Sequence, residues 1–132
     1  MKNRKKIAVV TGGAGFIGSH MVDLLLEKNY KVNVIDNLSG GHKKNLAHHK
    51  TNPNLKFEKK DVCTIKKDHK FFKNADYVFH FAGMGDIVPS IENPVNYMLT
   101  NIQGTVKVLE SARFNKIKKF FYSASASCYG IS

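Results

Sequence analysis

The stretch TGGAGFIG at residues 11–18 places four glycines within seven positions. It follows an apolar run at 7–10, IAVV, that is typical of a buried strand, and it precedes a helical pattern of apolar residues over 16–29. Glycine has no Cβ, so the turn can be tight and its amides can approach a ligand closely. The following helix offers unpaired N–H groups and the positive end of its dipole, which favour a diphosphate. The stretch therefore predicts a dinucleotide-binding turn.

The glycine pattern can be read in two registers, and the sequence alone leaves both open. One is GxGxxG, with Gly13, Gly15 and Gly18, and the other is GxxGxxG, which begins at Gly12 instead. A purely structural turn or helix cap also collects glycines, but the strand before and the helix after are the context that a dinucleotide-binding turn requires. A P-loop is excluded, because no Lys-Ser or Lys-Thr pair follows the glycines.

An acidic residue ends the next apolar run. Asp36 closes KVNVID at 31–36 and lies 18 residues after Gly18. A carboxylate at this position can accept hydrogen bonds from both ribose hydroxyls of an adenosine. We predict NAD rather than NADP, because a 2′-phosphate would meet a like charge and no arginine stands beside Asp36. The alternative is that Asp36 only shapes the turn at the end of the strand.

Short apolar runs alternate with longer amphipathic stretches, which indicates a parallel sheet covered by helices. We expect strands at 6–11, 31–36, 55–61, 76–83 and 118–126, and helices at 16–29, 64–75 and 93–116. Right-handed crossovers then give an α/β fold with a Rossmann-type doubly wound sheet in the order 3-2-1-4-5. A ligand would lie beyond the carboxyl ends of strands one and four, where the order reverses.

The last predicted helix has a pronounced periodicity, and Pro94 suits its first turn. Its apolar residues recur at steps of three and four, so we expect them to pack on the sheet. They are Val95, Met98, Leu99, Ile102, Val106, Leu109 and Ala112.

The charge of the chain restricts its partners. The net charge is +11, from 21 Lys and Arg against 10 Asp and Glu, which raises the possibility of nucleic acid. The lysines are scattered, and no RNA-binding aromatic signature, zinc finger or zipper accompanies them, so we expect no nucleic-acid partner. The positive field would equally attract a phosphate-bearing ligand. No apolar segment is long enough to suggest a membrane partner.

The cysteines and histidines suggest no metal site. Cys63 and Cys128 lie far apart without CxxC spacing, which fits reduced thiols in a cytoplasmic protein. His48 and His49 are adjacent in a lysine-rich loop without evident acidic partners, so we interpret them as solvated. His80 ends a buried strand and is expected to be a structural side chain with satisfied hydrogen bonds.

Six motifs together resemble the extended short-chain dehydrogenase/reductase family, specifically its NAD-dependent nucleotide-sugar epimerases and dehydratases, and among these the UDP-glucose 4-epimerases. They are TGGAGFIG at 11–18, DNLSGG at 36–41, DV at 61–62, HFAG at 80–83, NIQGT at 101–105 and SASASCYG at 123–130. The resemblance implies an NAD-binding Rossmann domain over 1–132, without the later strands and the sugar-binding region. It also implies a nucleotide-sugar substrate, with a UDP-sugar favoured, and a homodimeric parent enzyme.

The resemblance also assigns roles to residues. Phe16 and Ile17 amides would face the pyrophosphate, and Asp61 with Val62 the adenine. Asn101 would support the loop that cradles the cofactor, with an exposed helical asparagine as the alternative. The cofactor-binding residues implied are Gly12, Gly13, Gly15, Phe16, Ile17, Gly18, Asp36, Asn37, Ser39, Gly40, Asp61, Val62, Phe81, Ala82, Gly83, Asn101 and Ser123.

By the same resemblance, Ser125 is the active-site serine that would hydrogen-bond the sugar hydroxyl being oxidised. Ser123 and Ser127 compete with it, and close packing of a small-residue strand end is the alternative. The family's catalytic Tyr-x-x-x-Lys pair does not occur in the chain. We therefore expect the cofactor-binding half of an epimerase that passes through a keto sugar, inactive by itself. A 4,6-dehydratase and a non-catalytic NAD-binding module remain alternatives.

Overall fold

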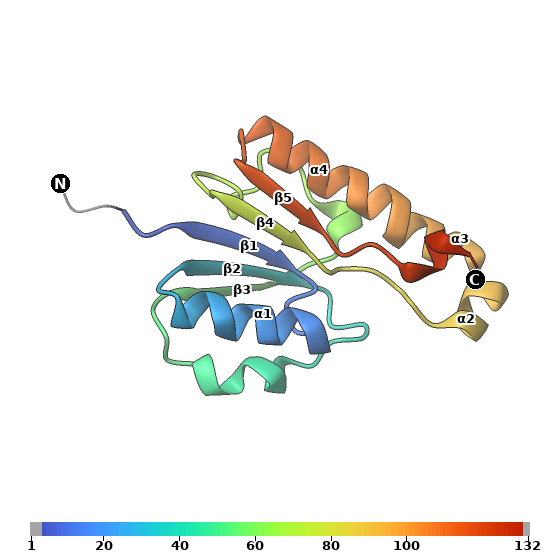
Figure 1. The fold of residues 1–132 in the computed structure, drawn as a ribbon, viewed down its shortest axis with the longest axis horizontal. Coiled ribbons are helices and arrows are strands. Elements are labelled where there is room, and N and C mark those ends of the chain that lie inside the picture. The colour runs from blue at the N-terminus through green and yellow to red at the C-terminus, as the bar shows by residue number, and fades with distance from the viewer. Residues whose placement is uncertain (1–3, 131–132) are drawn as a thin grey trace.

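The computed structural model describes residues 4–130, and its centre is a five-stranded parallel sheet. The strands are β1 (Ile7–Thr11), β2 (Lys31–Asp36), β3 (Leu55–Lys59), β4 (Tyr77–His80) and β5 (Lys119–Tyr122). They lie in the order β3-β2-β1-β4-β5, which confirms the predicted topology (Figure 1). Three strands end earlier than predicted, since β3, β4 and β5 end at Lys59, His80 and Tyr122.

Helices cover both faces of the sheet (Figure 1). One face carries α1 (Phe16–Glu27) and the 3-10 helix η1 (Lys43–His49). The other carries one continuous helical segment of α3 (Pro94–Met98), η3 (Leu99–Gly104) and α4 (Thr105–Phe114). Successive β1 side chains alternate between two cores, with Ala8 and Val10 on the α1 side and Val9 on the α4 side. A strand that is buried on both faces must be apolar throughout, which explains the run at 7–10.

The helix predicted over 64–75 is wrong. The chain there forms the short 3-10 helix η2 (Val62–Thr64) followed by turns, and Phe71 and Phe72 are buried in the core on the α4 side. The local hydrogen bonds of this segment are those of turns, such as the bond from the His69 amide to the Lys66 oxygen. Two of its carbonyls also accept from distant side chains, Phe71 from Asn33 and Lys66 from Ser111. The local turn bonds and the distant side chains together satisfy these backbone groups without a regular helix.

The face on which the long helix packs also differs from the prediction. Among the expected residues only Ala112 is buried, whereas Val95, Ile102 and Val106 are 62%, 61% and 52% exposed. The residues of this segment that are buried are Tyr97, Gly104, Val108, Ser111 and Ala112. The segment thus has two apolar faces. Periodicity detects a helix but does not identify which face meets the sheet.

The short helices α2 (Ile87–Glu92) and η4 (Ala126–Tyr129) were not predicted. Ile87, Val88 and Ile91 of α2 are exposed, so the helix adds to the apolar surface beside α3. The η3 part of the long helix has π-helical hydrogen bonding, a feature that often accompanies functional sites.

A buried carboxylate ties the amino ends of the strands together. The Asp76 side chain is 2% exposed and accepts hydrogen bonds from both Arg4 Nη atoms, at 3.0 and 2.9 Å, from Lys118 Nζ at 2.8 Å and from the Ile7 amide at 3.0 Å. Burial acts to raise the pKa of Asp76, but these hydrogen bonds, with that of Lys118 strongest, hold it below its ordinary value.

Candidate functional site

The glycine turn joins the carboxyl end of β1 to α1, and two of its glycines are required by close packing. Gly12 has φ of +68°, and a Cβ there would lie 2.6 Å from the Ala82 backbone nitrogen. A Cβ on Gly18 would collide with the Gly12 carbonyl oxygen. The turn therefore lies against the end of β4 on one side and against its own helix on the other.

Gly15 differs from the other glycines of the turn. A Cβ on it would meet only the Gly12 oxygen, at 3.2 Å, and its extended backbone suits any residue. Gly12, Gly15 and Gly18 line the crevice, whereas Gly13 is buried against Val34. The structure thus supports the GxxGxxG register, with Gly15 as the position open to a ligand.

The first turn of α1 presents its amides to this crevice. Gly15 is the N-cap, and the Ser19 amide makes the first intrahelical hydrogen bond, to the Gly15 oxygen at 3.0 Å. The amides of Phe16, Ile17 and Gly18 precede it, so they have no carbonyl within the helix to which they can donate. With the positive end of the helix dipole, they can bind an anionic group.

The crevice crosses the carboxyl ends of β1 and β4 and has two lobes that share Gly12, Gly15, Phe81, Ala82 and Gly83. The β2-side lobe also includes the predicted residues Asp36, Asn37, Ser39, Gly40 and Val62. The β5-side lobe also includes Phe16, Ile17, Gly18, Asn101, Ser123 and Ser125. Gly13 and Asp61 are the two predicted site residues that do not line either lobe.

The Asp36 carboxylate fixes the turns on both sides of the β2-side lobe. Oδ2 accepts from the Ala14 amide at 2.9 Å, and Oδ1 accepts from the Leu38 amide at 2.7 Å. The second bond holds Leu38 in a left-handed conformation, at φ of 65°. Each carboxylate oxygen can accept a further hydrogen bond. Asp36 is thus a turn former, as the alternative interpretation had it, and it still lines the lobe with acceptor capacity left.

Asp61 acts on the site through Asn37. Its Oδ1 accepts from the Cys63 amide at 2.8 Å, and its Oδ2 accepts from Asn37 Nδ2 at 3.1 Å. The Asn37 Oδ1 in turn accepts from the Ser39 amide and hydroxyl. Partial burial acts to raise the pKa of Asp61, but the hydrogen bonds from Cys63 and Asn37 outweigh it and lower that pKa. Asp61 therefore orients one wall of the β2-side lobe.

Asn101 clamps the loop after β4. Its Oδ1 accepts from the Met84 amide at 2.8 Å, and its Nδ2 donates to the Met84 oxygen at 2.9 Å. The alternative of an exposed helical asparagine is therefore wrong.

Gly104 lets this part of η3 approach η2, because a Cβ there would lie 2.8 Å from Val62 Cγ2.

A chain of hydrogen bonds runs beneath the crevice through His80. The Thr105 hydroxyl donates to the Asn101 oxygen at 2.7 Å, so it must accept from His80 Nε2, which lies at 2.9 Å. His80 Nδ1 then accepts from the Thr11 hydroxyl at 2.6 Å. Burial lowers the pKa of His80 to about 4, which fits this neutral tautomer. His80 is a structural side chain with both nitrogens satisfied, as predicted.

Lys60 and Tyr97 are among the crevice-lining residues that the sequence did not single out. Lys60 lines the β2-side lobe just after β3, where the rule that ligands lie beyond strand ends could have found it. Tyr97 lines the β5-side lobe, and its buried hydroxyl oxygen has no hydrogen-bond partner within residues 4–130. A buried hydroxyl without a partner is costly, so it fits a site where a ligand supplies the partner.

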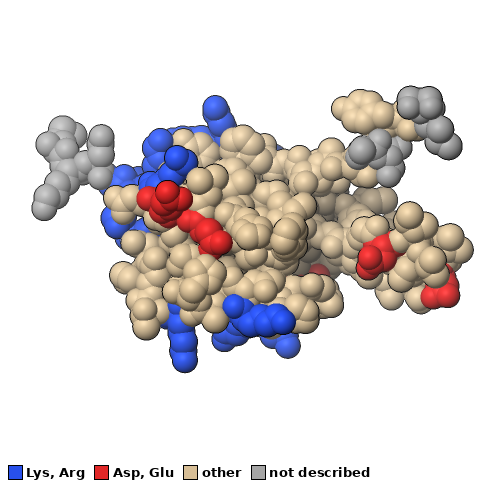
Figure 2. Space-filling view, turned by 60° about the horizontal axis from the view of Figure 1, so that its bottom comes forward, with Lys and Arg blue, Asp and Glu red and all other residues tan. Residues whose placement is uncertain are grey.

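Positive charge is unevenly distributed over the surface. Figure 2 shows Lys and Arg over the left and lower parts of this face, and none at the projecting right-hand end. The chain has no Lys or Arg between residues 74 and 106, the segment that supplies most of the wall of the β5-side lobe. The crevice therefore offers backbone amides and Lys60, and not a basic patch, to an anionic group.

The prediction for the adjacent histidines was incomplete. His48 and His49 do have an acidic partner, Asp23, which comes from α1.

The helices of residues 4–130 lack the length and hydrophobicity that a membrane crossing requires.

A parallel 3-2-1-4-5 sheet with its crevice at the β1/β4 switch point defines a Rossmann-type α/β domain. A family model described as the NAD dependent epimerase/dehydratase family matches residues 8–132. The chain belongs to this family.

Individual relatives agree with this assignment. A putative UDP-glucose 4-epimerase from Methanocaldococcus jannaschii is 42% identical over 124 residues, which are 92% of this chain and 39% of that protein. The UDP-N-acetylglucosamine 4-epimerase from Methanobrevibacter ruminantium, solved in complex with UDP-N-acetylmuramic acid, superposes with a TM-score of 0.89 at 40% identity over 97% of this chain and 40% of that one. A dTDP-glucose 4,6-dehydratase from Streptomyces venezuelae, solved with NAD bound, gives 0.80 at 33% identity over 86% and 38%. The chain thus spans less than half the length of these relatives.

Proposed function

We propose that this chain is the NAD-binding part of an NAD-dependent nucleotide-sugar epimerase that acts on a UDP-sugar. Family membership and the 4-epimerases among its relatives support the activity and the substrate class. The observation that carries the proposal is the crevice itself. It has the free amides of α1 at its centre and the Asp36 carboxylate in one lobe, and the other lobe is lined by Tyr97, whose hydroxyl is buried and unpaired within the described residues.

The two lobes suit the two halves of a dinucleotide. Asp36 would accept hydrogen bonds from the adenosine ribose, while Val62 and Gly40 enclose the adjacent base. The amides of Phe16 and Ile17 would hold the diphosphate where the lobes meet. The nicotinamide half would then lie in the β5-side lobe, beside Ala82, Gly83 and Ser123.

When bound, NAD supplies a reversible hydride acceptor, which allows a sugar hydroxyl to be oxidised to a keto group and reduced again from the other face. Ser125 lines the same lobe and would hydrogen-bond that hydroxyl. His80 also reaches this lobe, but its nitrogens are engaged by Thr11 and Thr105, so it would hold the floor rather than move the substrate proton.

Proton removal from the sugar would need the Tyr-x-x-x-Lys pair, which the 132 residues do not contain. We expect this chain to bind NAD without epimerising a nucleotide sugar. The exposed apolar face of α2, α3 and α4 is the surface on which we expect further protein to pack, either the sugar-binding region or the second subunit of a homodimer.

A 4,6-dehydratase is the second candidate. The likeness to the dehydratase from Streptomyces venezuelae favours it, and the residues described here serve either reaction. Product analysis distinguishes the two, because a dehydratase releases water and an epimerase does not.

Calorimetric titration of the chain with NAD tests the proposal. We expect one site per chain and at least tenfold weaker binding of NADP, because Asp36 would repel a 2′-phosphate. Gly15→Ala should weaken NAD binding, since its methyl group would stand where the ligand approaches, while the backbone conformation allows alanine. The thermal unfolding midpoint of this variant is the control for its fold. Absence of NAD binding by the unaltered chain contradicts the proposal.

A further inference from the structure

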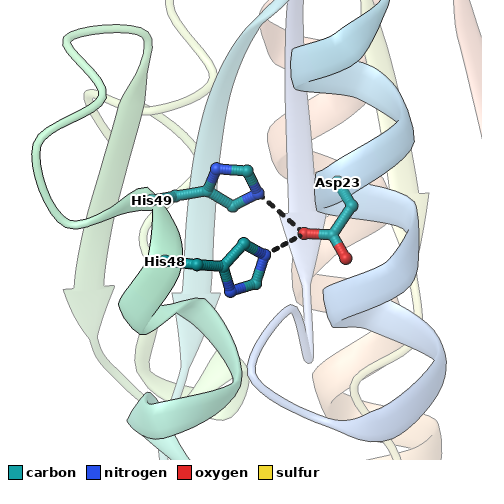
Figure 3. A group of neighbouring side chains, drawn as sticks. All are labelled: Asp23, His48 and His49. Atoms are coloured by element: carbon teal, nitrogen blue, oxygen red, sulfur yellow. Dashed lines mark hydrogen bonds and ion pairs between the residues drawn. The ribbon is translucent and has the colours of Figure 1, made fainter.

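Two histidines converge on one carboxylate outside the crevice (Figure 3). His48 and His49, at the end of η1, place their Nε2 atoms 2.8 and 2.7 Å from Asp23 Oδ1 on α1. His20, one turn earlier on α1, has its Nδ1 3.8 Å from the other Asp23 oxygen. Four potential metal ligands therefore meet here: the imidazoles of His48 and His49, the Asp23 carboxylate and, somewhat further away, the imidazole of His20.

The spacing of these atoms suits a metal ion. One potential ligand atom from each of Asp23, His48 and His49 lies within 4.8 Å of the others. A tetrahedral zinc site with bonds of about 2.0–2.1 Å has its ligands about 3.3 Å apart. An ion inserted among the three groups would thus separate them by roughly half an ångström from their present hydrogen bonds. Small rotations of surface side chains can provide this, because Asp23 and His48 are 38% and 56% exposed.

We propose that Asp23, His48 and His49 bind a divalent transition-metal ion of the zinc type. Imidazole nitrogens favour such ions over calcium and magnesium, which prefer several oxygen ligands. The fourth position would be filled by water or by His20.

Metal binding here would join η1 to α1. Nearer the start of η1, Asn45 Nδ2 already donates to the oxygen of Ala14, in the turn before α1, at 2.8 Å. A ligand that binds only the folded chain stabilises it, so the ion should raise the unfolding temperature. This site is independent of the crevice, and its test does not depend on NAD.

The test is calorimetric titration of the EDTA-treated, dialysed chain with zinc chloride. We expect one ion per chain, and binding weaker by about tenfold or more in Asp23→Asn, His48→Gln and His49→Gln. His42→Gln is the matched control, because His42 is an exposed histidine just before η1 and outside the cluster. It should bind as the unaltered chain does.

Cobalt(II) provides a second readout. The visible absorption of the bound cobalt should indicate nitrogen and oxygen ligands in the unaltered chain and in His42→Gln. It should weaken in His48→Gln. Because the His48 side chain is exposed, we expect this variant to keep its fold, so a weaker absorption would reflect a lost ligand. The proposal is overturned if zinc does not bind, or if the cluster variants and His42→Gln bind it equally.

Discussion

Replacing Tyr97 by phenylalanine should change stability and NAD binding in opposite directions. Tyr97 is buried, and its hydroxyl has no partner within the described residues, so the folded chain bears an unsatisfied polar group. Such a group costs about 1–3 kcal/mol, and the phenyl ring keeps the packing of the tyrosine. Tyr97→Phe should therefore raise the free energy of unfolding by about 1 kcal/mol in the absence of ligand.

If bound NAD supplies the missing partner of the Tyr97 hydroxyl, as we propose, the same change also removes that hydrogen bond. A neutral hydrogen bond contributes about 0.5–1.5 kcal/mol, so the dissociation constant should rise about 2- to 12-fold. Urea unfolding and calorimetric titration measure the two effects on the same preparations. A tyrosine that only fills space would give no change in affinity.

Tyr30→Phe is the matched control. Tyr30 precedes β2 at the amino end of the sheet, where its ring lies beside Lys6, and it does not line the crevice. Its substitution should leave NAD affinity unchanged. Equal affinities for Tyr97→Phe, Tyr30→Phe and the unaltered chain would refute the role of the Tyr97 hydroxyl, and lower stability of Tyr97→Phe would refute the view that this hydroxyl is unpaired.

Three other predictions concern the groups that support the site and the sheet. Asn101→Leu should lower the free energy of unfolding by about 2 kcal/mol through loss of both bonds to Met84, and should weaken NAD binding; unchanged urea midpoints would contradict this. Burial lowers the pKa of His80 to about 4, so between about pH 6.5 and 4 the imidazole is protonated in the unfolded chain only, and the free energy of unfolding should fall by up to about 3 kcal/mol over that range. His80→Gln should show a shallower decline. Ring ¹⁵N NMR of the unaltered chain at pH 6 should find the imidazole proton on Nε2. Because the pKa of Asp76 is lowered in the folded chain, the ionised Asp76 carboxylate stabilises the fold above the ordinary carboxyl pKa, and this contribution is lost as the pH falls. Asp76→Asn should lower the free energy of unfolding by about 2 kcal/mol at pH 7. Unfolding curves measured at acid pH should show a smaller difference between the variant and the unaltered chain.

The sequence predicted the features that depend on local pattern. Strand runs, the glycine turn and the helix after it follow from periodicity and from the absence of side chains at Gly12, Gly15 and Gly18. The strand order follows from right-handed crossovers between parallel strands. Asp36 could be identified because it ends the second predicted strand, 18 residues after Gly18, and the structure places it in the lining of the crevice.

The tertiary structure decided the features that depend on distant partners. Asn101 is hydrogen-bonded to the Met84 backbone, and the buried Tyr97 hydroxyl has no partner within the described residues. His48 and His49 hydrogen-bond to Asp23 of α1. Residues 64–75 likewise form turns and not a helix, because Phe71 and Phe72 pack in the core and Ser111 of α4 donates to the Lys66 oxygen. Local propensity is worth tenths of a kcal/mol per residue, whereas burial and long-range hydrogen bonds are each worth about one or more, so the distant contacts prevail where the two disagree.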